Sequence, residues 1–164
     1  MNAYVNRKIV ACPEPILPAD VLALIKERAK LVDEIIVPGG PLDQYLLKEN
    51  VDPKSATVYF YGSSCTGVPF LQKKSGVAYV TAQSDIDFLV FANKVNGTLW
   101  RMPEGPNRPF EYNSVPVEVI SGYVQGSVLD EFLFNLFGLK IYSKEATLAV
   151  PFSSKLVRSP SPPD

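Results

Sequence analysis

The segment that limits the possible folds most is IDFLVFA, residues 86–92, which is apolar at every position except Asp87. β-Branched and aromatic residues are favoured in strands. A strand that is apolar on both faces is typical of the centre of a sheet that is covered on both sides. The segment therefore predicts a central strand, and the rest of the chain has to supply its neighbouring strands and its covering helices.

Two further strands are predicted in residues 55–62, SATVYFYG, and in residues 115–124, VPVEVISGYV. Residues 144–157 fit either an edge strand or coil. Hairpins are expected in residues 68–82, and between residues 93–102 and residues 108–115, because Gly, Ser, Asn and Pro interrupt apolar runs there.

Helices are predicted in residues 18–37 and 41–50. In the first, apolar residues recur at spacings of three and four, which is the pattern of an amphipathic helix. It begins after Pro18 and is stopped by Pro38-Gly39-Gly40. Residues 128–139 predict a short apolar helix that ends at Gly138. Helices do not separate all the strands, so the expected fold is α/β (α+β), a mixed β-sheet with helices packed on it.

The chain has 164 residues, enough for one ordinary domain. We expect a single domain over residues 1–158 and a disordered tail over residues 159–164, SPSPPD, because Pro and Ser without apolar residues cannot form a core. The N-terminal apolar run is too short for a signal peptide. Since no run approaches a membrane span, we expect no membrane partner and a cytoplasmic location.

Composition excludes several kinds of chemistry. The chain has no histidine and two cysteines, Cys12 and Cys65, so a zinc site or a histidine-based nucleophilic mechanism is excluded. The net charge of −1 provides no overall field that recruits nucleic acid. Chemistry in this chain has to use carboxylates, hydroxyls, lysines or a hard metal ion held by oxygen atoms.

Asp85 and Asp87 lie two positions apart at the mouth of the predicted central strand. Residues i and i+2 of a strand point to the same face, so the two carboxylates are expected side by side. Such a pair is tolerated if it is exposed at the strand end, shares a proton or holds a cation. Mg²⁺ suits the spacing, because it prefers a few carboxylates together with water and substrate phosphates.

A Gly-Ser turn follows the strand predicted in residues 55–62. Gly62 is followed by Ser63 and Ser64, and Gly67 ends the short turn. Backbone N–H groups and hydroxyls in such a turn can receive phosphate oxygens.

The order of these features resembles the DNA polymerase β-like nucleotidyltransferase superfamily. The family pattern runs from Gly-Ser, through a second Gly and a spacer, to Ser-Asp-hydrophobic-Asp-hydrophobic. The matching residues are Gly62-Ser63, Gly67 and Ser84-Asp85-Ile86-Asp87-Phe88. The resemblance covers residues 55–91 closely and residues 20–120 loosely, and it implies a minimal, single-domain nucleotidyltransferase-like fold.

The spacing departs from the family in one respect. Asp85 lies 23 positions after Gly62, and the connector in the family is usually much shorter. We interpret residues 69–83 as an inserted β-hairpin with its turn near Ser75-Gly76, because an insertion in a loop costs little closure entropy.

The resemblance implies a role for each matching residue. Asp85 and Asp87 would bind one or two Mg²⁺ (or Mn²⁺) ions that carry a nucleoside triphosphate. The implied nucleotide-binding residues are Gly62, Ser63, Ser64, Gly67 and Ser84. The family uses a third carboxylate on a later strand, for which Glu118 is the best match and Glu111 the alternative.

The implied reaction transfers a nucleoside monophosphate from the triphosphate to a hydroxyl acceptor, which could belong to a small molecule, a protein or an RNA end. A homodimer or a partner chain is expected, because no large second domain is evident. Two other hypotheses remain, an inactive nucleotidyltransferase-like binding or regulatory protein, and an interaction protein in which the motif is accidental. Weaker candidates for substrate contacts are Lys73, Lys74, Arg101, Arg108 and Trp100, and Cys65 is expected to be structural.

Overall fold

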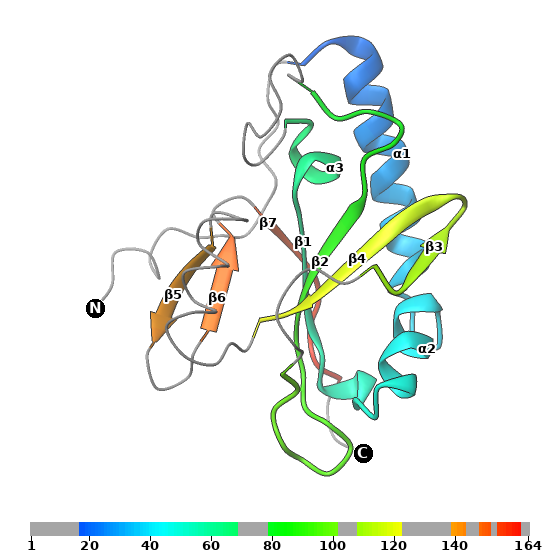
Figure 1. The fold of residues 1–164 in the computed structure, drawn as a ribbon. Coiled ribbons are helices and arrows are strands. Elements are labelled where there is room, and N and C mark those ends of the chain that lie inside the picture. Colours follow the sequence, from blue (N-terminus) through cyan, green and yellow to red (C-terminus); the bar gives the residue numbers. More distant parts are fainter. Residues whose placement is uncertain are drawn as a thin grey trace.

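A five-stranded mixed sheet organises the part of the chain that the computed structural model describes (Figure 1). The described residues are 17–68, 79–101, 108–122, 139–143, 148–151 and 154–161. The strands follow the order β3-β4-β2-β1-β7 across the sheet. Their bounds are Thr57–Tyr61 (β1), Ile86–Phe91 (β2), Phe110–Tyr112 (β3), Val115–Ser121 (β4) and Ser154–Arg158 (β7). The predicted mixed sheet with helices packed on it is confirmed.

Strand β2 lies at the centre of the sheet, as its sequence predicts. It pairs in parallel with β4 and antiparallel with β1. Phe88 and Val90 belong to the core beneath the helices, and Leu89, which points to the opposite face, is equally buried. Both faces of β2 are therefore covered, which explains why apolar residues follow one another without alternation.

Helices α1 (Ala19–Ile35) and α2 (Pro41–Lys48) lie on one side of the sheet (Figure 1). Both confirm the predicted helices. The buried face of α1 includes Val32 and Ile35, and that of α2 includes Leu42 and Leu46. These residues share one core with the helix-facing side of β1, β2 and β4. Two short helical turns, η1 (Pro53–Ser55) and α3 (Ser63–Thr66), flank β1 at its two ends.

Strand β7 resolves the ambiguity of residues 144–157. It pairs antiparallel with β1 at the edge of the main sheet. The Arg158 guanidinium donates to the Asp43 carboxylate on α2 and to the carbonyls of Ile36 (3.3 Å) and Pro53 (3.1 Å). This ion pair is largely buried, and it fastens the edge strand to the helical layer. Strand β6 (Leu148–Pro151) pairs with β5 (Leu139–Ser143) in a separate two-stranded sheet.

The hairpin predicted between residues 93–102 and residues 108–115 is wrong. Strand β3 pairs with β4 instead, through a two-residue turn at Asn113-Ser114. Both turn residues have left-handed backbone angles, with φ of +48° and +65°. Such a turn matches the twist of two antiparallel strands, and it closes a much smaller loop than the predicted hairpin requires.

Several predictions fall on residues outside the described ones. They are most of the inserted hairpin (residues 69–78), the apolar helix over residues 128–138, and residues 162–164 of the tail.

The domain boundary at residue 158 stays a prediction. The Ser161 N–H donates to the Lys54 carbonyl at 2.8 Å. Among the described helices, none has the length and apolar character needed to cross a membrane.

The turn between β3 and β4 provides a test of this pairing. Because Ser114 has a φ of +65°, replacing it with glycine removes the steric cost of a Cβ in a left-handed conformation. We expect Ser114→Gly to raise the free energy of unfolding by about 1 kcal/mol in urea denaturation. The matched control is Ser159→Gly, in exposed coil, which should be neutral or slightly destabilising. An equal loss of stability in both variants would contradict the turn.

Candidate metal centre

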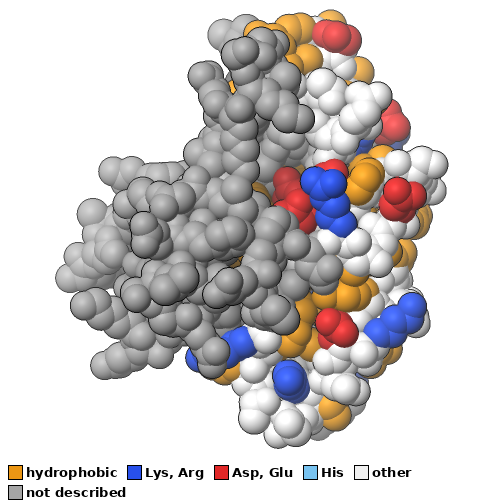
Figure 2. Space-filling model, in the orientation of Figure 1, with side chains coloured by type: hydrophobic (Ala, Val, Ile, Leu, Met, Phe, Trp, Pro, Cys, Tyr) orange, Lys and Arg blue, Asp and Glu red, His pale blue; other side chains and the backbone are white. Residues whose placement is uncertain are grey.

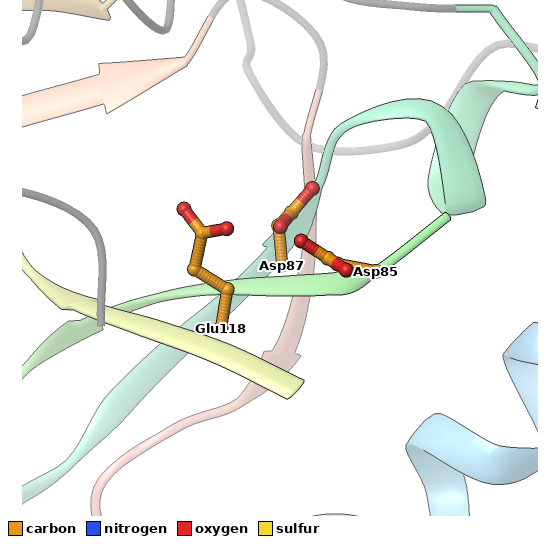
Figure 3. A group of neighbouring side chains, drawn as sticks. All are labelled: Asp85, Asp87 and Glu118. Atoms are coloured by element: carbon orange, nitrogen blue, oxygen red, sulfur yellow. The ribbon is translucent and has the colours of Figure 1, made fainter. Parts of the chain in front are cut away.

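Three carboxylates converge where β2 begins beside β4 (Figure 3). Asp87 lies directly opposite Glu118 in the parallel register of β2 and β4, so both side chains point to the same face. Asp85 precedes Asp87 by two residues and points the same way (Figure 3). One oxygen from each of the three carboxylates lies within 4.8 Å of the others. The sheet therefore presents three oxygen ligands to one point.

Gly62 brings the end of β1 against this cluster. Tyr61, the last residue of β1, pairs with Asp87. Gly62 follows with a φ of +84°, and a Cβ built on it would overlap Oδ2 of Asp87 and lie 3.2 Å from its Cγ. Only glycine fits both the left-handed angle and this close approach. The Gly-Ser turn and the aspartate pair, separated by 23 positions in sequence, thus meet in space.

The surroundings of the cluster disfavour the charged forms of its carboxyl groups. Burial, and then the charges of Glu118 and Asp85, raise the pKa of Asp87 well above its ordinary value. Burial, and then the charge of Asp85, raise the pKa of Glu118 from 4.5 to about 7. Without a cation, the cluster therefore retains a proton near neutral pH.

Among the described residues, Arg108 forms ion pairs with the cluster. Its guanidinium lies 2.7 Å from Oδ2 of Asp85 and 3.7 Å from Oε2 of Glu118. The arginine side chain is 63% exposed, and the two carboxylate side chains are 14% and 7% exposed. Figure 2 shows basic and acidic side chains next to each other at the middle of the visible face. Arg108 is one of the candidates that the sequence offered for a substrate contact, and it lies beside the carboxylates. Its contact with a substrate stays a prediction.

Ser64 and Arg28 hold the backbone that leads into β2. The Ser64 hydroxyl, which is fully buried, donates to the Asp85 carbonyl at 2.6 Å. The Arg28 guanidinium on α1 donates to the carbonyls of Ser84 (2.5 Å) and Ala82 (2.8 Å), and to the Ser64 hydroxyl (3.3 Å). Three separate elements, α1, α3 and the segment before β2, are thereby joined at Asp85. A phosphate contact from the Ser64 hydroxyl would have to replace this bond.

Arg28 is the residue of this region that the sequence analysis missed. It is 2% exposed, and it lies on the same helical face as Val21, Leu31 and Val32. The available signal was a charge in the middle of an apolar helical stripe, where burial requires partners. Burial lowers the pKa of Arg28, and the neighbouring charges of Glu27 and Asp85 act in the opposite direction.

The inserted segment does not separate the two halves of the motif. The Val80 N–H donates to the Gly67 carbonyl at 2.8 Å, so the chain returns to the turn from which it left. Gly67 itself ends α3 with a φ of +85° and packs against Leu17 and Val21. The Ser84 hydroxyl accepts from the Thr81 N–H at 3.0 Å. Ser63 is partly exposed in the turn beside Gly62.

The structure also places the remaining candidates. Glu111, the alternative third acid, is exposed on β3 and lies outside the carboxylate cluster. Trp100 is buried, with its ring edge-on to Tyr45, so it packs in the core. Cys65 is buried in α3 and is disulfide-bonded, which agrees with a structural role. Arg101 is partly exposed. Lys73 and Lys74 lie outside the described residues.

Comparison of the chain with protein-family models, with curated proteins and with solved structures finds no match in any of the three. The function therefore has to be inferred from the geometry and chemistry of the carboxylate cluster.

The raised pKa of Glu118 predicts an unusual pH dependence of stability. The folded protein binds this proton more tightly than the unfolded chain, so the metal-free protein should lose stability as the pH rises from about 4.5 to about 7. The raised pKa of Asp87 acts in the same direction. Chemical denaturation in EDTA at several pH values measures this. Because the chain has no histidine, few other groups titrate between pH 5 and 7.

Glu118→Gln should remove much of this fall in stability, because the amide does not titrate. Glu111→Gln, which changes an exposed acid on the adjacent strand, is the matched control and should leave the fall unchanged. A parent protein whose stability is flat from pH 5 to 7 would contradict the buried, charge-coupled cluster.

The link from Arg28 through Ser64 to Asp85 is tested by a double-mutant cycle. Arg28→Met leaves buried carbonyls without donors and should cost about 2–4 kcal/mol of unfolding free energy. Ser64→Ala should cost less in the Arg28→Met background than in the parent, because the two side chains share one network. Lys30→Met, exposed on the same helix, is the control. Strict additivity of the two losses would show that the residues act independently.

Proposed function

We propose that this chain is a Mg²⁺-dependent nucleotidyltransferase of the DNA polymerase β-like type, which transfers a nucleoside monophosphate from a nucleoside triphosphate to a hydroxyl acceptor. One observation carries the proposal. Carboxylates on two adjacent parallel strands converge to within 4.8 Å beside a Gly-Ser turn, in the order and strand context that the family pattern requires.

The donor set fits a hard divalent cation. Asp85, Asp87 and Glu118 offer only carboxylate oxygens, which Mg²⁺ and Mn²⁺ prefer. Their excess negative charge, which holds a proton in the metal-free state, is what a divalent ion would neutralise. Mg²⁺ bound there would stabilise the attacking and leaving oxygens of an in-line displacement at the α-phosphorus.

The residues of the site would bind the metal, bind the phosphates and accept a proton. Asp85 and Asp87 would hold the metal that carries the triphosphate, while the turn at Gly62-Ser63 would lie along its β- and γ-phosphates. Glu118 would complete the metal site and is the candidate to take the proton of the acceptor hydroxyl. None of these tasks needs histidine, which is consistent with a chain that has none.

A second function has a specific observation in its favour. Arg108 pairs with both Asp85 and Glu118, so its guanidinium provides part of the charge balance that a metal ion would provide. A permanent pairing of this kind would suit an inactive nucleotidyltransferase-like protein that acts as a binding or regulatory partner. The exposure of the arginine, at 63%, favours the catalytic proposal, because an exposed ion pair is readily exchanged.

The proposal is tested first by binding. Titration calorimetry with an uncleavable ATP analogue and Mg²⁺ should show binding to the parent protein. Asp85→Asn combined with Asp87→Asn should abolish it, because both neutral amides bind Mg²⁺ poorly. The double variant should remain folded, and without metal it should be slightly more stable than the parent, because like charges are removed.

The matched control is Asp20→Asn combined with Asp33→Asn, which removes two exposed acids from α1. It should bind the analogue like the parent. If the variant at positions 85 and 87 binds as well as the parent, the proposed metal site is excluded. Incubation with labelled triphosphates, Mg²⁺ and candidate acceptors then separates an enzyme from an inactive binding protein, because only the enzyme releases pyrophosphate.

A further inference from the structure

Arg108 combines two properties that a permanent structural ion pair does not need. It contacts two of the three clustered carboxylates, and most of its own side chain is in solvent. Its two carboxylate partners are nearly buried. An exposed arginine gains little net stability from such a pair, because water screens the attraction and holding the long side chain costs entropy.

The carboxylates and the guanidinium compete with any metal ion. A divalent cation that binds Asp85 and Glu118 uses the same two carboxylates that now face Arg108. Once those oxygens coordinate the cation, the attraction that holds the guanidinium there is largely cancelled. The arginine would then lie beside the bound cation, with its donors available to the phosphates that the cation carries.

We propose that Arg108 exchanges partners during substrate binding: it pairs with Asp85 and Glu118 in the metal-free protein and binds the triphosphate once a divalent cation takes those carboxylates. This inference depends on the proposed function, because it assigns a substrate contact within the same site. Arg108 then recognises the anionic substrate. Its ion pairs with Asp85 and Glu118 in the structure represent the state without metal or substrate.

The chemistry of arginine suits both states. Its planar guanidinium carries five donors and stays charged at all relevant pH values, so it binds carboxylate or phosphate oxygens in the same fork geometry. Arg108 lies in coil, two positions before Phe110, the first residue of β3. The strand fixes the nearby backbone, while the exposed side chain is free to reach from one anionic partner to another.

Two binding measurements on Arg108→Ala test the exchange, because they should change in opposite directions. Without nucleotide, removal of the competing cation should tighten Mn²⁺ binding, by about threefold to tenfold. With saturating Mg²⁺, removal of the phosphate contact should weaken binding of an ATP analogue that has a methylene group between its α- and β-phosphates, by about tenfold or more. Binding of inorganic tripolyphosphate should be weakened to the same degree, because Arg108 would contact the phosphate groups and not the nucleoside.

Controls separate this role from general damage to the site. Arg108→Lys should change both affinities less than Arg108→Ala does, because lysine keeps the positive charge but lacks the planar, forked guanidinium group. Lys26→Ala, which removes an exposed cation from α1, should change neither affinity. Since the Arg108 side chain is largely exposed, circular dichroism should show that all variants fold.

The outcomes distinguish the inference from the proposed function. If Arg108→Ala weakens both Mn²⁺ and nucleotide binding, or changes neither, the exchange is wrong, while nucleotide binding by the parent protein still supports the proposed function. If the parent protein binds neither Mn²⁺ nor the nucleotide analogue, the proposed function fails, and the inference fails with it.

Discussion

The repulsion between Asp87 and Glu118 is the interaction on which the site depends. The parallel register of β2 and β4 places the two acids directly opposite each other, within the buried centre of the sheet. Two largely enclosed carboxylates this close cannot both remain charged without compensation. In the metal-free protein the raised pKa values of Asp87 and Glu118 favour a bound proton, and Arg108 adds a positive charge on the solvent side. A divalent cation would meet it more completely, which links the proposed function to the energetics of the fold.

A rigid backbone keeps this unfavourable cluster in place. Gly62 closes one side of Asp87, and the buried Arg28 and Ser64 side chains hold the carbonyls of the chain that enters β2. The backbone at Asp85 therefore cannot shift without breaking hydrogen bonds to α1 and α3. Pre-organised ligands of this kind bind a metal ion at lower entropic cost than flexible ones do.

Much of the fold was predictable because its signals are local. The periodicity of α1, the β-branched residues of β1 and the unbroken apolar run of β2 each depend on neighbouring residues. The hairpin at Asn113-Ser114 was missed, because Pro and Gly around residues 103–109 suggested a different turn. The pair of left-handed turn residues, neither of them glycine, gives only a weak signal in sequence. The spacing of Asp85 and Asp87 singled out the aspartate pair, and the family resemblance implied one of two glutamates as the third acid.

The sequence by itself determined which chemistry is possible: a chain without histidine is limited to carboxylates, hydroxyls, lysines or a hard metal ion held by oxygen atoms. Two aspartates at a strand mouth and a Gly-Ser turn upstream favour the hard metal ion. Only the tertiary structure decided that Glu118 rather than Glu111 completes the cluster, that Val80 returns to Gly67 across the insertion, and that Arg28 and Arg108 belong to the site. These facts depend on strand register and on side chains far apart in the chain. Register is set by which apolar faces pack together, and that packing involves the whole sheet and its helices.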